Sequence, residues 1–227
     1  MRILFFLLLG LAPCALAVEP VILVLGDSLS ASYRIDVDQG WVSLLQSRLQ
    51  EKGYAYKVAN ASISGDTTRG GLARLDALLV KHQPAIVIVE LGANDGLRGL
   101  SLNEVRDNLT AIIKKAQGQG AKVVLPAMRL PPNYGPLYTE RFEQMYAEVA
   151  RETGARPAPF LLKDVADRAA WMQGDGLHPL ATAQPTILGN LWPELEPLIV
   201  DAPSKPVVPL TPEVPPLAKP LENRAAP

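Results

Sequence analysis

The sequence predicts an α/β protein, with a mainly parallel sheet sandwiched between helices. Two short, strongly apolar runs, residues 21–25 and 85–91, have the length of strands and little polar alternation. Such runs are typical of strands that are buried on both faces of a parallel sheet. Segments with apolar residues at helical spacing alternate with these and with further short strands, and this alternation places helices on both faces of the sheet.

The remaining elements follow in chain order. We expect helices over residues 41–52, 72–82, 101–116, 142–149 and 183–192, and shorter strands over 57–60, 122–125 and 159–162. Residues 130–136 are rich in proline and predict a loop. Ser101 and Glu104 have the spacing of a capping box at the start of the third helix. Pro193 and Pro197 should bend or end the last helix, because proline lacks the amide hydrogen that a helix needs.

Both ends of the chain differ in composition from its middle. Arg2, the apolar residues 3–11 and the small residues around Ala17 are typical of a cleavable signal peptide over residues 1–17. Residues 201–227 contain eight prolines and no apolar period, which predicts an extended, disordered tail. One domain over residues 18–200 is therefore expected, in a protein that is periplasmic or secreted.

Cysteine and charge exclude several kinds of function. Cys14 is the only cysteine, so cleavage after Ala17 leaves no disulfide, no thiol nucleophile and no cysteine metal site. Lipoprotein processing at Cys14 is the alternative, which Pro13 fits poorly. The formal net charge is −1, and loss of Arg2 makes it more negative, which argues against a nucleic-acid partner.

The first predicted strand ends at Gly26-Asp27-Ser28, where all three residue types favour a turn. Ligands of open α/β sheets collect beyond the carboxyl ends of the strands, so Ser28 stands where a nucleophile would be useful. A strand-ending turn with a capping serine is the structural alternative for this short motif.

Only two histidines are present, His82 at a polar helix end and His178 in the loop Gly174-Asp175-Gly176-Leu177-His178. Such a loop can return the carboxylate of Asp175 to the imidazole three residues later. This hydrogen bond would fix the tautomer of a general base for acyl transfer. A structural Asp–His pair is the alternative interpretation.

Acyl transfer also needs hydrogen-bond donors for the oxyanion. Gly65 and Asn94 follow two other predicted strands and could supply a backbone N–H and a side-chain amide. Each alone could be a turn residue, but Ser28, Gly65 and Asn94 at three strand ends make a joint case. The motif G-x-S-x-G, a phosphate-binding glycine loop and a dinucleotide fingerprint do not occur, and we expect no metal and no cofactor.

Four sequence blocks resemble, in order, those of the SGNH or GDSL hydrolases. The blocks contain Gly26-Asp27-Ser28-Leu29-Ser30, Ser62-Ile63-Ser64-Gly65-Asp66, Gly92-Ala93-Asn94-Asp95 and Asp175-Gly176-Leu177-His178. Longer strings such as residues 60–67, 94–99 and 129–131 are similar to the periplasmic bacterial members that cleave aryl esters, acyl-CoA thioesters and lysophospholipids. The similarity extends over residues 20–200, although Ala93 stands where relatives often have a second glycine.

The resemblance implies a three-layer α/β/α sandwich of the flavodoxin-like type. It implies Ser28 as nucleophile, His178 as general base and acid, and Asp175 as its orienting group. The Ser28 and Gly65 backbone N–H groups and the Asn94 side chain would form the oxyanion hole. Leu97, Leu100 and Leu130 would border the acyl groove. We expect a monomer that acts on small-molecule acyl esters or thioesters, without a stable membrane anchor.

Two other functions stay open at this point. The chain could be an O-deacetylase or acyltransferase that acts on envelope polysaccharide, although its apolar loops favour an acyl chain. It could also be a non-catalytic envelope-binding protein, against which the presence of Ser28, Asp175 and His178 together speaks.

Overall fold

The computed structural model describes residues 19–200, which contain one sheet of five strands. The strands are β1 (Val21–Gly26), β2 (Lys57–Asn60), β3 (Ile86–Glu90), β4 (Lys122–Pro126) and β5 (Arg156–Ala158). Their order is β2-β1-β3-β4-β5, and every pair of neighbours is parallel. The predicted parallel α/β sheet is confirmed.

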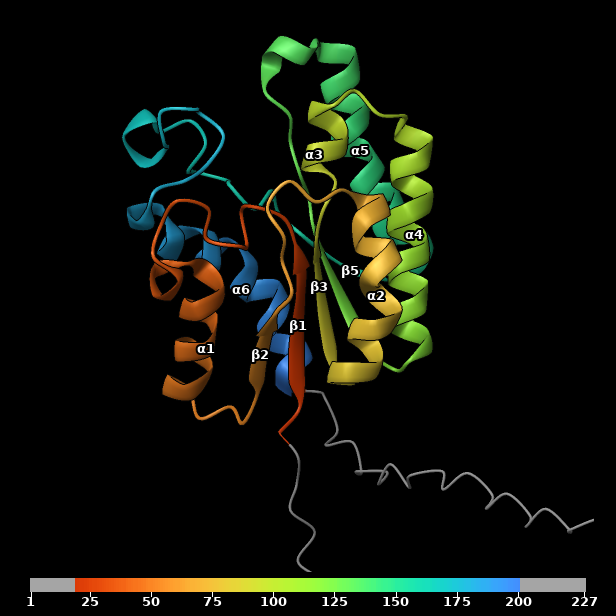
Figure 1. Ribbon diagram of the computed structural model, residues 1–227, viewed down its shortest axis with the longest axis vertical. Coiled ribbons are helices and arrows are strands. Elements are labelled where there is room, and N and C mark those ends of the chain that lie inside the picture. The colour runs from red at the N-terminus through yellow and green to blue at the C-terminus, as the bar shows by residue number, and fades with distance from the viewer. Residues whose placement is uncertain (1–18, 201–227) are drawn as a thin grey trace, which may run out of the picture. The chain divides into compact units, whose positions relative to one another are not determined.

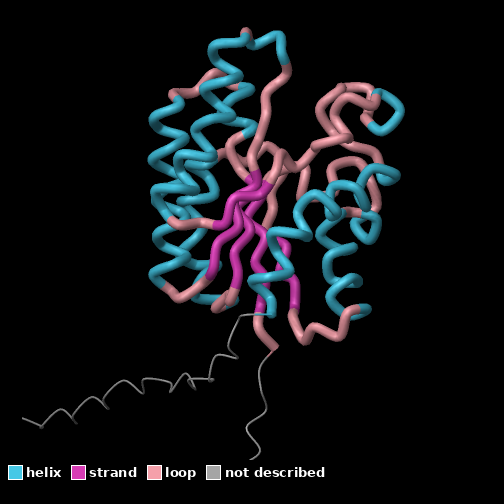
Figure 2. The backbone as a smooth tube through the Cα atoms, turned by 180° about the vertical axis from the view of Figure 1, so that it is seen from behind, coloured by secondary structure: helices cyan, strands magenta, loops and turns pink. Residues whose placement is uncertain are grey.

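Helices cover both faces of this sheet (Figures 1 and 2). On one face lie α1 (Trp41–Glu51) and α6 (Gln184–Val200). On the other lie α2 (Thr68–His82), α4 (Leu102–Gly118) and α5 (Pro136–Thr153). The short helix α3 (Ala93–Leu97) follows β3 directly. This is the three-layer α/β/α sandwich that the resemblance implies.

The two central strands explain why the sheet needs cover on both faces. The side chains of β3 are all fully buried, and so are those of β1 from Ile22 to Leu25. Burial of each large aliphatic side chain stabilises the fold by about 1.5–3 kcal/mol. The buried residues of β3 include the carboxyl group of Glu90, which the apolar pattern of the strand does not explain.

The register of the strands gathers three loops at one edge of the sheet. Gly26 at the end of β1 lies opposite Glu90 at the end of β3, and Val24 lies opposite Asn60 at the end of β2. Because the strands are parallel, the segments that leave these ends emerge side by side, at the upper edge in Figure 1. All three predicted oxyanion residues lie in these segments.

The last strand differs from the prediction of residues 159–162. The chain pairs with β4 over Arg156–Ala158 and leaves the ladder at Pro159, which has no amide hydrogen to donate. Leu161 and Leu162 are buried in the turn that follows. Their apolar character therefore reflects burial by a turn, and the strand prediction at these residues is wrong.

Two expectations about helix ends also differ from the structure. α6 continues through Pro193 and Pro197 to Val200. Its side chains Leu191, Leu195 and Ile199 are buried, and this burial outweighs the cost of about 3 kcal/mol for a proline inside a helix. Ser101 is the residue before α4, as expected, but its side chain makes no capping hydrogen bond.

The expected signal peptide (residues 1–17) and tail (residues 201–227) lie outside the described residues. Within residues 19–200, no helix combines the length and the apolar character that a membrane span requires.

Candidate active site

Ser28 lies in the turn that follows β1. The backbone of Gly26 passes so close to β3 that an added Cβ would lie 2.7 Å from Glu90 Oε2 and from Ser30 Oγ. Only glycine fits there, and the chain turns at once, with Ala31 N donating to Asp27 O at 2.9 Å. The half-buried Ser28 is thereby held beyond the end of the sheet.

Ser28, His178 and Asp175 form a chain of two short hydrogen bonds. Ser28 Oγ lies 2.8 Å from His178 Nε2, and His178 Nδ1 lies 2.8 Å from Asp175 Oδ2. An ionised carboxylate only accepts hydrogen bonds, so Nδ1 carries the proton and Nε2 is free to accept one from the serine. The fold thus brings Ser28 and His178, which are 150 positions apart in the sequence, into contact.

Asp175 is held as a carboxylate by its own loop. Burial acts to raise its pKa, but N–H groups of Leu177 and His178 donate to Oδ1, and the imidazole contacts Oδ2. These hydrogen bonds lower the pKa of Asp175 to about 2. The group is therefore ionised throughout the neutral range.

Further contacts orient the imidazole from behind. The ring of Tyr33 packs on that of His178 with 4.3 Å between centroids. Gln173 Nε2 donates to the Tyr33 carbonyl at 2.9 Å, and Gln173 N donates to the His178 carbonyl at 2.7 Å. Neither residue was expected at the site. Tyr33 is remote from His178 in the sequence, and no motif marks Gln173, although it lies close to His178 along the chain.

Asn94 lies in the first turn of α3, beside the turn that carries Ser28. Its Nδ2 donates one hydrogen bond to Asp27 Oδ2 at 2.9 Å. Asp27 Oδ1 accepts from Leu29 N at 3.0 Å, so the carboxylate is held between its own turn and the start of α3. Asn94 and Ser28 line the same cavity.

Gly65 lies in the segment after β2 with a φ of +79°, a conformation that favours glycine. Its carbonyl oxygen accepts from Arg98 Nη2 at 2.9 Å. Within residues 19–200, the backbone N–H groups of Ser28 and Gly65 form no hydrogen bond. Gly65 is not among the residues that line the cavity of Ser28.

A cavity of about 580 Å³ opens beside Ser28 and His178. This volume is typical of small-molecule sites. Its apolar lining includes Leu97, Met128, Leu130, Phe160 and Leu162. The expected groove residues Leu97 and Leu130 thus lie in it. Leu100 does not: it lines a second cavity of about 600 Å³ between the start of α4 and the start of α5.

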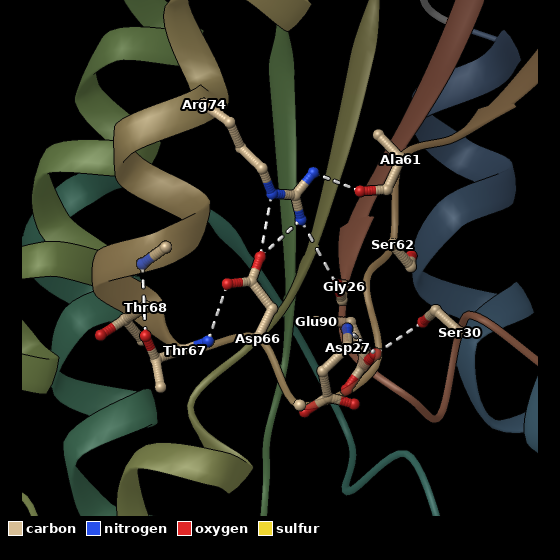
Figure 3. A network of polar contacts seen from close by, with 12 residues as sticks. Gly26, Asp27, Ser30, Ala61, Ser62, Asp66, Thr67, Thr68, Arg74 and Glu90 are labelled. Carbon is tan, nitrogen blue, oxygen red and sulfur yellow. Dashed lines mark hydrogen bonds and ion pairs between the residues drawn. The ribbon is translucent and has the colours of Figure 1, made fainter. Parts of the chain in front are cut away.

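Asp27, which precedes Ser28, and Glu90 at the end of β3 form a pair of buried carboxyl groups (Figure 3). Glu90 Oε2 accepts from Ser30 Oγ at 2.6 Å and from Asp27 N at 3.1 Å. Burial, and then the charge of Asp27, raise the pKa of Glu90 well above its usual range. Burial raises the pKa of Asp27 to about 6, although hydrogen bonding from Leu29 N opposes it. We therefore assign one proton to the pair, on Glu90. A lone acidic residue inside an apolar strand was the signal that could have identified it.

Within the described residues, no group of three or more His, Cys, Asp or Glu side chains could hold a metal ion.

Comparison with known proteins identifies the family. Residues 24–184 match the GDSL-like lipase/acylhydrolase family. The chain belongs to this family. Esterase TesA of Pseudomonas aeruginosa is 51% identical over 183 residues, which cover 81% of this chain and 91% of that protein. A solved structure of TesA superposes with a TM-score of 0.77 at 52% identity and covers 78% of this chain and 99% of that one.

A second relative has a broader name. Thioesterase 1/protease 1/lysophospholipase L1 of Escherichia coli K12 is 43% identical over 194 residues, covering 86% of this chain and 92% of that protein. This GDSL hydrolase is accordingly a carboxylic ester hydrolase whose substrates are small-molecule esters and thioesters.

Proposed function

We propose that this GDSL hydrolase cleaves esters and thioesters through an acyl-enzyme on Ser28. The observation that carries this proposal is the pair of 2.8 Å contacts from Ser28 Oγ through His178 to Asp175. A serine hydroxyl is a weak nucleophile until a neighbouring base accepts its proton. His178 is the base in contact with it, in the tautomer that can accept this proton.

In the first step, Ser28 Oγ attacks the acyl carbonyl carbon and its proton passes to His178 Nε2. Asp175 stabilises the resulting imidazolium. The tetrahedral intermediate carries a negative charge on the former carbonyl oxygen, and we assign its donors to Ser28 N, Gly65 N and Asn94 Nδ2. Each such donor contributes about 10²–10³-fold in rate.

In the second step, the carbon–oxygen or carbon–sulfur bond to the leaving group breaks and His178 returns its proton to the leaving atom. A water molecule then gives a proton to His178 and attacks the acyl-enzyme, which releases the carboxylic acid and free Ser28. The same residues therefore serve both half-reactions.

The cavity supports an apolar acyl chain as the preferred acyl group. Leu97, Leu130 and Phe160 present apolar surface, and Lys163 and Asp167 supply charge among the residues that line it. We propose aryl esters, acyl-CoA-like thioesters and lysophospholipids as the substrate class. The leader-like residues 1–17 support export to the periplasm, and we place the enzyme there.

The test is hydrolysis of p-nitrophenyl esters from acetyl to palmitoyl by residues 18–227, with Ser28→Ala as the matched variant. We expect turnover that disappears in Ser28→Ala, and stoichiometric labelling of Ser28 by a fluorophosphonate. Turnover that persists in Ser28→Ala would overturn the proposal. Activity confined to acetyl esters would favour an O-deacetylase, and a folded protein with neither turnover nor labelling would favour a binding protein.

A further inference from the structure

The side chain of Arg74 on α2 contacts three separate segments near the predicted oxyanion residues (Figure 3). Its Nε and Nη2 contact the same oxygen of Asp66, Oδ2, at 2.9 and 2.8 Å. Its Nη1 donates to the carbonyl oxygen of Ala61, just beyond β2, and Nη2 makes a longer contact of 3.5 Å with the carbonyl oxygen of Gly26. One guanidinium thus joins the ends of β1 and β2 to the start of α2.

This ion pair is largely enclosed. The side chains of Arg74 and Asp66 are only 21% and 11% exposed. By contrast, Arg69, which is also on α2 and pairs with Glu104 of α4, has a side chain that is 79% exposed. The second oxygen of Asp66 accepts from Thr67 N at 2.9 Å. Movement of either side chain would leave the other charge desolvated and unpaired, which is costly. Enclosed charges with this many partners are therefore held in one geometry.

The segment that the pair holds is the turn of Gly65. Asp66 N donates to the Ile63 carbonyl at 3.0 Å, and the φ of +79° at Gly65 belongs to the third residue of a type II turn. Ile63 N in turn donates to the Gly26 carbonyl at 3.0 Å. The turn is therefore attached to β1 two residues before Ser28, and Arg74 contacts the same carbonyl group.

We propose that Arg74 and Asp66 are positioning residues for the reaction: their ion pair fixes the Gly65 N–H relative to Ser28. The proposal rests on the function proposed above, since it assumes that Gly65 N donates to the oxyanion. Neither Arg74 nor Asp66 is among the residues that line the cavity beside Ser28. Asp95, next to Asn94, holds the other end of the segment by accepting from Thr68 N at 2.9 Å and Thr68 Oγ1 at 2.6 Å.

The experiment compares Arg74→Lys, Asp66→Asn and Arg74→Ala with the control Arg69→Lys, in the chain of residues 18–227. We measure kcat and KM for p-nitrophenyl butyrate, the rate constant of inactivation by diethyl p-nitrophenyl phosphate, and Tm. Lysine keeps the charge of Arg74 but loses the planar fork. We expect kcat to fall about 10–100-fold in the Arg74 and Asp66 variants, with KM within about twofold of the wild type. Loss of one oxyanion donor lowers kcat about 10²–10³-fold, and a donor that is only misplaced should have a smaller effect.

Inactivation should slow in parallel with kcat, because the phosphoryl oxygen needs the same donors. Methylguanidinium should restore part of the kcat of Arg74→Ala, an effect that general destabilisation does not produce. The control Arg69→Lys should match the wild type. Unchanged kcat in folded Arg74→Lys and Asp66→Asn, or a loss expressed in KM alone, would overturn the proposal.

Failure of the proposed function gives a different result. In that case the wild type would not be labelled at Ser28, and Ser28→Ala would retain turnover. Failure of the positioning proposal alone leaves a labelled, active wild type and Arg74 variants that equal it.

Discussion

The side-chain amide of Asn94 donates one of its two hydrogens to Asp27 Oδ2 at 2.9 Å. Only acceptors are available on an ionised carboxylate, so this bond determines which end of the amide is nitrogen. The second amide hydrogen is then available to a substrate oxygen in the cavity that both residues line. Asp27, the central residue of the Gly-Asp-Ser motif, thus orients the side-chain amide of Asn94 on α3.

Replacement of Asn94 should affect the rate and leave the fold intact. We expect Asn94→Ala to lower kcat by about 10²–10³-fold, because one oxyanion donor is lost. KM for p-nitrophenyl butyrate and Tm should change little. Asp27→Ala should have a smaller effect on kcat, and the double variant should be no worse than Asn94→Ala, since both act through one amide. Additive losses would contradict this coupling.

The pKa of Asp27 predicts how stability depends on pH. The pKa is about 6 in the folded protein against 3.8 for an ordinary aspartate. The contribution of this carboxyl to stability is therefore full below pH 3.8 and is lost as the pH rises through about 6. Relative to Asp27→Asn, the wild type should lose up to about 3 kcal/mol between pH 4 and 7, at about 1.4 kcal/mol per pKa unit. Urea unfolding at several pH values measures this difference, and a constant difference would contradict it.

Glu90 should matter to stability through its hydrogen bonds. With the shared proton assigned to Glu90, Glu90→Gln keeps the shape and the charge of the side chain, and it should lower the free energy of unfolding by about 1 kcal/mol. Glu90→Ala leaves Ser30 Oγ and Asp27 N without their acceptor and opens a cavity, which should cost about 3 kcal/mol or more. Chemical denaturation at pH 7 compares the two variants. Equal losses in the two variants would contradict this prediction.

A matched glycine, Gly99, separates the proposed oxyanion role of Gly65 from the backbone strain that a substitution at either glycine causes. Gly65 and Gly99 have φ values of +79° and +66°, and no atom lies within 3.4 Å of a Cβ added to either. Substitution by alanine should therefore cost each about 1–2 kcal/mol of stability. Only Gly65→Ala should also lower kcat, by about tenfold or more, because the turn that presents its N–H must shift. Equal kcat values in the two variants would contradict the oxyanion role.

The acyl cavity can be tested with a pair of neighbouring leucines. Leu97→Trp should fill the cavity beside Ser28 and lower kcat/KM for decanoyl esters about tenfold or more, while acetyl esters are little affected. Leu100→Trp should leave the ratio of kcat/KM for decanoyl esters to kcat/KM for acetyl esters unchanged, because Leu100 lines the other cavity. A shift in chain-length preference in Leu100→Trp would contradict this division.

The sequence by itself determined the fold class, and it selected the residues that we propose for the site. Strands such as β3 carry an apolar run whose length and composition leave few alternatives to a buried parallel strand. Ser28, Asp175 and His178 could be selected because the chain has so few histidines and no cysteine beyond Cys14. These conclusions depend on local pattern and residue type, and both can be taken directly from the amino-acid sequence.

Only the tertiary structure decided how the site is held. Three contacts join residues on different elements: Asp27 with Asn94, Glu90 with Ser30, and Arg74 with Gly26. In the sequence alone, each of these residues is indistinguishable from an ordinary turn, strand or helix residue. The end of β5 and the passage of α6 through its prolines were likewise decided by pairing and burial. These hydrogen bonds and this burial form between segments that are distant in the sequence, so the local sequence pattern cannot predict them.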